Sequence, residues 1–172
     1  VLFRSQVQTL FNQALNWAYG FNHDEAIRSL TAAAKIDPDC PMIWWAIAYC
    51  EGPNYNLPIT PERSKAAWYA LQNAVARKAN GTDRERALIE ALAQRYRWPA
   101  PEDRSDLDAA YADAMRHVWE QYPDDPDIGT LYAESMMMLR PWELYTTDGT
   151  PEAGTDQIVA ALESVLKMRP KI

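Results

Sequence analysis

The segment from Leu10 to Pro38 constrains the fold of this chain more than any other stretch of its sequence. Apolar residues recur there every three or four positions, then a short turn intervenes and the same spacing returns: Leu10, Ala14 and Trp17, followed by Ala26, Leu30 and Ala33. Asp24 and Glu25 open the second series, where negative charge suits the positive end of a helix dipole. The pattern predicts two amphipathic helices that end at Asp37-Pro38.

Three further segments follow the same plan, so the sequence predicts four repeat units with the ranges 7–40, 41–81, 82–126 and 127–170. Tyr122-Pro123 and Arg169-Pro170 repeat the stop at Asp37-Pro38, because proline cannot continue a helix in its interior. Units two to four carry long insertions between their helices, at 52–60, 97–103 and 140–154. These insertions are rich in proline or glycine, which predicts loops.

The 34-residue period from Val7 to Cys40 resembles the tetratricopeptide repeat (TPR) family, in the form of bacterial-type members with long loops inside the repeats. Small residues at the expected helix crossings are the most specific match: Ala14, Ala26, Ala48 and Ala93. The resemblance implies an all-α fold, a right-handed α-solenoid of about four antiparallel helix pairs. It also implies a concave groove lined by the first helix of each pair, and loops aligned along one rim.

Both ends of the chain look incomplete. Residues 1–5, Val-Leu-Phe-Arg-Ser, match the translation of a common sequencing adapter, and we expect them to be non-native. A polar capping helix, which repeat arrays generally need, is missing after Pro170. We therefore expect residues 6–172 to be a truncated piece of a longer array. The location of the protein stays open between cytoplasm and periplasm.

Composition and charge exclude several classes of function. The net charge of −7 argues against nucleic-acid binding, which favours basic surfaces. No apolar run approaches the roughly 20 residues that a membrane helix needs, so we expect no membrane insertion. Cys40 and Cys50 have no second Cys or His at ligand spacing, and we expect neither a metal nor another cofactor.

The search for catalytic residues gives no motif. No nucleophile elbow, zinc-protease helix, phosphate-binding glycine loop or dinucleotide fingerprint is present in the sequence. The two histidines, His23 and His117, are expected in a turn and on a solvated helix face. We therefore predict that this segment is not an enzyme.

The resemblance places a partner-binding groove on the first helices of the pairs. Projection from the packing residues gives the following groove set: Phe11, Asn12, Leu15, Tyr19, Met42, Trp45, Tyr49, Glu90, Gln94 and Glu134. Aromatic and Met side chains are enriched in interface cores. Two alternatives stay open for Trp45 and Tyr49, which either face the groove or fill space beneath the 52–60 loop. Phe11, Leu15 and Ala46 stand where carboxylate-clamp members carry Lys, Arg or Asn, so a clamp is disfavoured.

Three functions compete. The first is a protein–protein interaction scaffold that holds an extended peptide or partner segment in the groove. The second is a small-molecule or metal-binding module built on the loop rim, where aromatic faces combine with hydrogen-bonding groups: Asn54, Tyr55, Asn56, Trp98 and Trp142. The third is a regulatory segment of a larger enzyme. The scaffold is the preferred hypothesis, and the sequence does not identify the partner.

Overall fold

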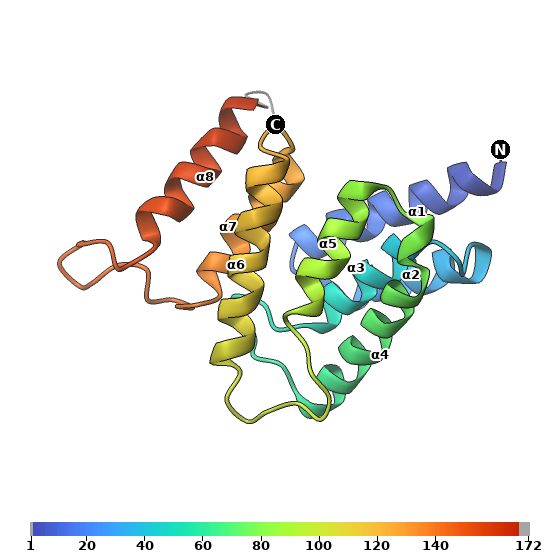
Figure 1. Cartoon of the computed structure of the whole chain (residues 1–172), viewed down its shortest axis with the longest axis horizontal. Coiled ribbons are helices and arrows are strands. Elements are labelled where there is room, and N and C mark those ends of the chain that lie inside the picture. The colour runs from blue at the N-terminus through green and yellow to red at the C-terminus, as the bar shows by residue number, and fades with distance from the viewer. Residues whose placement is uncertain (1, 169–172) are drawn as a thin grey trace. The chain divides into compact units, whose positions relative to one another are not determined.

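The computed structural model describes residues 2–168, and helices make up most of that range (Figure 1). Within it no β-strand forms, and only isolated bridges join Asn54 to Leu57 and Tyr145 to Pro151. The prediction of an all-α fold is confirmed. The predicted stop at Arg169-Pro170 lies outside the described residues. The helices are α1 (Leu2–Tyr19), α2 (His23–Ile36), α3 (Pro41–Glu51), α4 (Pro61–Arg77), the 3₁₀ helix η1 (Lys78–Asn80), α5 (Asp83–Ala93), α6 (Ser105–Gln121), α7 (Pro126–Met137) and α8 (Thr155–Met168).

Local signals in the sequence explain where several helices begin. Pro41, Pro61 and Pro126 occupy the first position of α3, α4 and α7, where the missing N–H costs no hydrogen bond. The predicted start near Thr82 is confirmed, because Thr82 caps α5. Its hydroxyl accepts a bond from the Glu85 N–H at 3.3 Å, and the Glu85 carboxylate accepts one from the Thr82 N–H at 2.7 Å.

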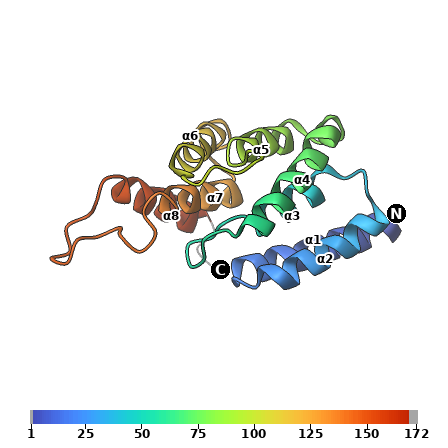
Figure 2. The ribbon, with the colours of Figure 1, turned by 90° about the horizontal axis from the view of Figure 1, so that it is seen from below.

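The chain forms two compact units, and unit 1 comprises residues 1–53 and 59–101. Within it α1 packs on α2, α3 packs on α2 and α4, and α5 packs on α3 and α4 (Figure 2). The crossings are lined by alanines that are almost fully buried, and these let the helices approach closely: Ala14, Ala26, Ala33, Ala48, Ala67 and Ala74. Trp17 was predicted on the packing face of α1 but is 40% exposed. Ala18 is buried beside Ala14 instead.

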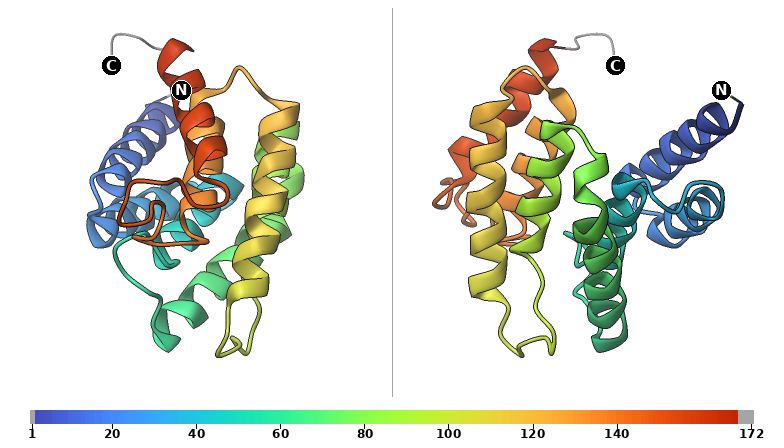
Figure 3. Two further views of the ribbon diagram at one scale, coloured as in Figure 1. Left: turned by 90° about the vertical axis from the view of Figure 1, so that its left-hand side faces the viewer. Right: turned by 45° about the vertical axis from the view of Figure 1, so that its right-hand side comes forward.

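Unit 2 comprises residues 54–58 and 102–172, and in its described part α7 packs on both α6 and α8 (Figure 3). Gly129 lies at this crossing. A Cβ atom there would stand 2.6 Å from Cγ2 of Val165 and 2.8 Å from Cζ3 of Trp119, so a larger residue would clash. The chain passes between the units after Pro53, Pro58 and Pro101. The four repeat boundaries remain a prediction.

None of the helices in residues 2–168 combines the length and the apolar character that are required to span a lipid bilayer.

Candidate functional site

The α1 part of the predicted groove set lies at the surface of unit 1. Phe11 and Leu15 are half-buried, Asn12 is exposed, and Tyr19 is 46% exposed. Asn12 accepts a hydrogen bond from the Gln8 side chain at 2.8 Å, one turn away. Phe21, which the sequence analysis did not select, follows Tyr19 and is 57% exposed at a φ of 59°. The end of α1 therefore presents several large apolar side chains to solvent.

The α3 part of the groove set is largely buried. Trp45 is 3% exposed, its indole N–H donates to the Leu88 carbonyl at 3.1 Å, and its ring stacks on Tyr49 with centroids 5.6 Å apart. Met42 is also buried, whereas Tyr49 is half-buried. Of the two alternatives left open for Trp45, this geometry favours the core.

The remaining groove residues carry polar side chains and are divided between the units. Glu90 on α5 and Gln94, which directly follows α5, are exposed, and the Glu90 carboxylate pairs with Nζ of Lys78 at 2.6 Å. Glu134 is half-buried on α7, in unit 2. The structure therefore brings the α1, α3 and α5 residues together in one unit and assigns Glu134 to the other.

Two of the predicted rim loops meet in unit 2. The Tyr55 hydroxyl accepts a hydrogen bond from the backbone N–H of Trp142 at 2.9 Å, and the two rings lie 5.1 Å apart at 37°. The Asn54 side chain accepts a bond from the Asn56 N–H at 3.0 Å and so shapes the turn that presents Tyr55. Trp98 belongs to unit 1, where Nζ of Lys65 lies 5.9 Å from its ring centroid.

Arg63 of α4 holds the end of α3, where the 52–60 loop begins. Its guanidinium donates to the carbonyls of Cys50 at 2.8 Å and Glu51 at 3.4 Å, and it pairs with Asp24 at 3.0 Å. These bonds satisfy carbonyls at the end of α3 that have no partner inside the helix. Arg63 thereby ties together the ends of three helices.

Two further side chains hold the same loop start in place. Arg95 is fully buried and donates to the Pro53 carbonyl at 3.0 Å, and the Tyr96 hydroxyl donates to the Ala48 carbonyl at 2.9 Å. A Cβ on Gly52 would lie 2.0 Å from that hydroxyl oxygen, so glycine is required by close approach. These contacts therefore hold the start of the loop, Gly52-Pro53, in place.

Burial shifts the pKa of three groups in this region. It raises the pKa of the Glu51 carboxyl, and nearby Asp24 adds to that effect while Arg63 opposes it. It lowers the pKa of His23, and the charge of Arg63 lowers it further. Burial also raises the pKa of the Cys50 thiol to about 12, so Cys50 stays protonated. All three groups lie at helix ends, at the start of α2 and the end of α3.

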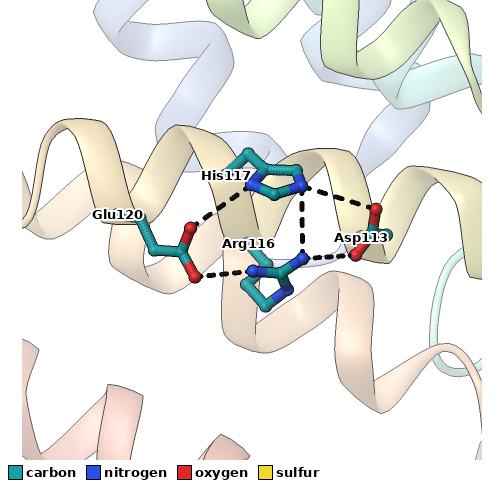
Figure 4. A network of polar contacts seen from close by, with 4 residues as sticks. All are labelled: Asp113, Arg116, His117 and Glu120. Carbon is teal, nitrogen blue, oxygen red and sulfur yellow. Dashed lines mark hydrogen bonds and ion pairs between the residues drawn. The ribbon is translucent and has the colours of Figure 1, made fainter.

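The second histidine lies in an exposed polar network on α6 (Figure 4). Arg116 pairs with Asp113 at 2.7 Å and with Glu120 at 2.6 Å, and His117 lies 3.3 Å from Glu120. Hydrogen bonds from Arg116 lower the pKa of both carboxyls. Each of the two acidic residues stands three or four positions from both Arg116 and His117 on one helix, the usual spacing of surface ion pairs. In the part of the chain that the structure describes, no three His, Cys, Asp or Glu side chains are grouped to hold a metal ion.

Charge is divided unequally between the units, which the sequence analysis did not detect because it considered only the total. The sequence of unit 2 has 15 Asp and Glu residues against six Lys and Arg residues, a net of −9. Unit 1 has nine against eleven, a net of +2. Counting charges on each side of residue 101 would have revealed this division.

Unit 2 also contains a pocket of about 440 Å³ beside the Trp142 loop. It lies between α7, the loop that follows α7, and α8. Five apolar and two charged residues line it: Met136, Leu139, Leu144, Ala153 and Ile158, with Arg140 and Glu143. This loop was expected to form part of a rim, but a pocket was not predicted, because three of the lining residues lie outside the loop, at positions assigned to helix packing or left unassigned: Met136, Leu139 and Ile158.

Comparisons of the chain with protein-family models, with curated proteins and with solved structures found no match.

Proposed function

We propose that this protein is an interaction scaffold without catalytic activity, whose unit 1 binds an extended segment of a partner polypeptide at the end of α1. One observation carries the proposal: three aromatic residues within five positions, Trp17, Tyr19 and Phe21, are each more than a third exposed. Clustered exposed apolar side chains mark interaction sites more often than scattered ones. Tyr and Trp are also the residue types that most often dominate binding energy in interfaces.

The proposal includes a TPR-like array with a right-handed solenoid arrangement. Its support is the pairing of consecutive helices, α1 with α2, α3 with α4 and α7 with α8. The 34-residue period of residues 7–40 supports it as well. Phe11 and Leu15 then extend the binding surface along α1. The proposal leaves Trp45 out of this surface, because its side chain is 3% exposed.

A second candidate function is ligand binding by the loops of unit 2. The contact between Tyr55 and Trp142 favours it, because this contact joins two rim loops that are 87 residues apart in the sequence.

The first candidate is tested with a peptide selected from a displayed random library against the full chain, with affinity measured by fluorescence polarisation. The variant Tyr19→Ala/Phe21→Ala removes two exposed rings and should keep its circular dichroism spectrum. We expect it to bind the peptide at least tenfold more weakly. Tyr69→Ala is the matched control, since Tyr69 is 55% exposed on α4 of the same unit. Equal affinity of both variants and the parent protein would contradict the α1 surface.

A further inference from the structure

The pocket of unit 2 is lined by both apolar and charged residues. Met136, Leu139, Leu144 and Ile158 supply the apolar wall, and Glu143 supplies a carboxylate. The other charged residue of the lining, Arg140, pairs with Glu152 at 3.4 Å, so its positive charge is largely offset. The pocket therefore suits a group that is aliphatic along its length and cationic at its end.

An exposed tryptophan is adjacent in the sequence to the pocket lining. Trp142 lies between Arg140 and Glu143 in the sequence, and it is 73% exposed although its backbone is fixed by Tyr55. The face of a tryptophan ring attracts cations more strongly than that of any other aromatic side chain. The Tyr55 ring, with its centroid 5.1 Å from that of Trp142, restricts the indole in advance, which lowers the entropy lost on binding a ligand.

The charge of the surroundings points to the same class of ligand. Unit 2 has a net charge of −9, and its pocket loop carries Glu143 and Asp148 in addition to the Arg140–Glu152 pair. Hydrogen bonds from the Thr146 side chain and the Thr150 backbone lower the pKa of Asp148, which stays ionised. A surface potential of this sign raises the local concentration of positively charged partners.

We propose that unit 2 binds a basic polypeptide segment, with the aliphatic stem of a Lys or Arg side chain in the pocket and its cationic end between the Trp142 ring and the Glu143 carboxylate. Long basic side chains lay their methylene groups along apolar surfaces while the charged end stays in a polar environment. The proposal rests on the proposed function in one respect, that the partner is a polypeptide. It concerns a different surface from the end of α1.

The test uses the full chain and a fluorescein-labelled peptide of alternating Lys and Gly, with a Glu and Gly peptide as the negative probe, in 150 mM salt. Trp142→Ala removes the ring without changing charge, and Glu143→Gln removes one carboxylate. We expect Trp142→Ala to weaken binding of the Lys peptide by up to about fivefold, the upper end of the range for a cation over an exposed aromatic ring. We expect Glu143→Gln to weaken it by a similar factor. The matched controls are Leu166→Ala and Glu163→Gln, exposed positions on α8, which should change affinity less than twofold.

Three results would overturn the proposal. If Glu163→Gln weakens binding as much as Glu143→Gln and Trp142→Ala has no effect, the attraction is non-specific. If tetramethylammonium binds as tightly as the peptide, the site takes a free cation rather than a polypeptide. Failure to bind the Lys peptide at all also contradicts it. The Tyr19→Ala/Phe21→Ala variant should bind the Lys peptide normally, so the failure of either surface can be told from failure of the other.

Discussion

Replacing Trp45 by alanine should destabilise unit 1 severely. The indole is 3% exposed, so its removal leaves a cavity in a packed interior, for which Trp→Ala changes cost about 3–5 kcal/mol. The Leu88 carbonyl also loses the donor that lies 3.1 Å away, and Tyr49 loses its stacking partner. Such terms overlap, so we expect a total loss near the upper end of that range, about 4–5 kcal/mol.

A phenylalanine at the same position separates packing from hydrogen bonding. Trp45→Phe keeps a ring against Tyr49 but removes the N–H that reaches Leu88, so we expect a loss of about 1–3 kcal/mol. Tyr69→Ala serves as the control, because truncation of a side chain that is 55% exposed should change stability by about 0.5 kcal/mol or less.

Urea unfolding followed by far-ultraviolet circular dichroism measures these differences as shifts of the midpoint at an unchanged slope. The order of stability should be parent protein, then Trp45→Phe, then Trp45→Ala. A Trp45→Ala protein that unfolds within about 0.5 kcal/mol of the parent protein would refute the reasoning. Trp45 would then return to the partner surface as a candidate anchor.

Three further changes test other contacts. Gly52→Ala should lower the free energy of unfolding by about 1–3 kcal/mol, because the added Cβ meets the Tyr96 hydroxyl at 2.0 Å. The loss should be smaller in a Tyr96→Phe background, and equal costs in both backgrounds would count against this clash. Gly129→Ala should lower the melting temperature, because the added Cβ would stand 2.6 Å from Cγ2 of Val165, although alanine ordinarily stabilises a helix by about 1 kcal/mol. Val165→Ala should relieve part of this effect. A raised melting temperature of Gly129→Ala would show that the crossing can adapt. The pKa of His23 is lowered in the folded protein, so the imidazole binds a proton more readily in the unfolded chain. The stability that neutral His23 contributes is therefore complete above about pH 6.5 and is lost as the pH falls through the folded-state pKa. His23→Gln should flatten that slope in urea midpoints measured from pH 7.5 to pH 5, and an unchanged slope would contradict the assignment.

The helices themselves could be predicted because their signals are local. Apolar spacing, a proline at the first position of α4 and a capping threonine before α5 each depend on a few neighbouring residues. The face that each helix buries was harder to predict. In α3 the apolar residues surround the axis, from Ile43 through Ile47, so periodicity gives no direction in which Trp45 should point. Its burial depends on the position of α5, which is set by tertiary packing.

The candidate sites likewise have features that the sequence predicts and features that depend on tertiary packing. Aromatic and proline-rich loops could be recognised from composition, and two of them do meet. The particular contact between Tyr55 and Trp142 could not be derived, because it joins positions 87 residues apart through one hydroxyl and one backbone N–H. Trp17 shows the reverse error. Its helical spacing was correct, but the small Ala18 beside it is the residue that is buried, because a bulky ring does not fit into the tight helix crossing.

The passage of the chain between the units makes this protein suited to fragment complementation. A single break after Pro101 gives two pieces, and the N-terminal piece retains residues 54–58 of unit 2. Tyr55 then lies on one piece and Trp142 on the other, so unit 2 is complete only when both pieces are present. Co-expressed halves should therefore recover the tryptophan environment of the intact chain, whereas residues 102–172 alone should not. A split reporter for folding could be built at this position without engineering an interface.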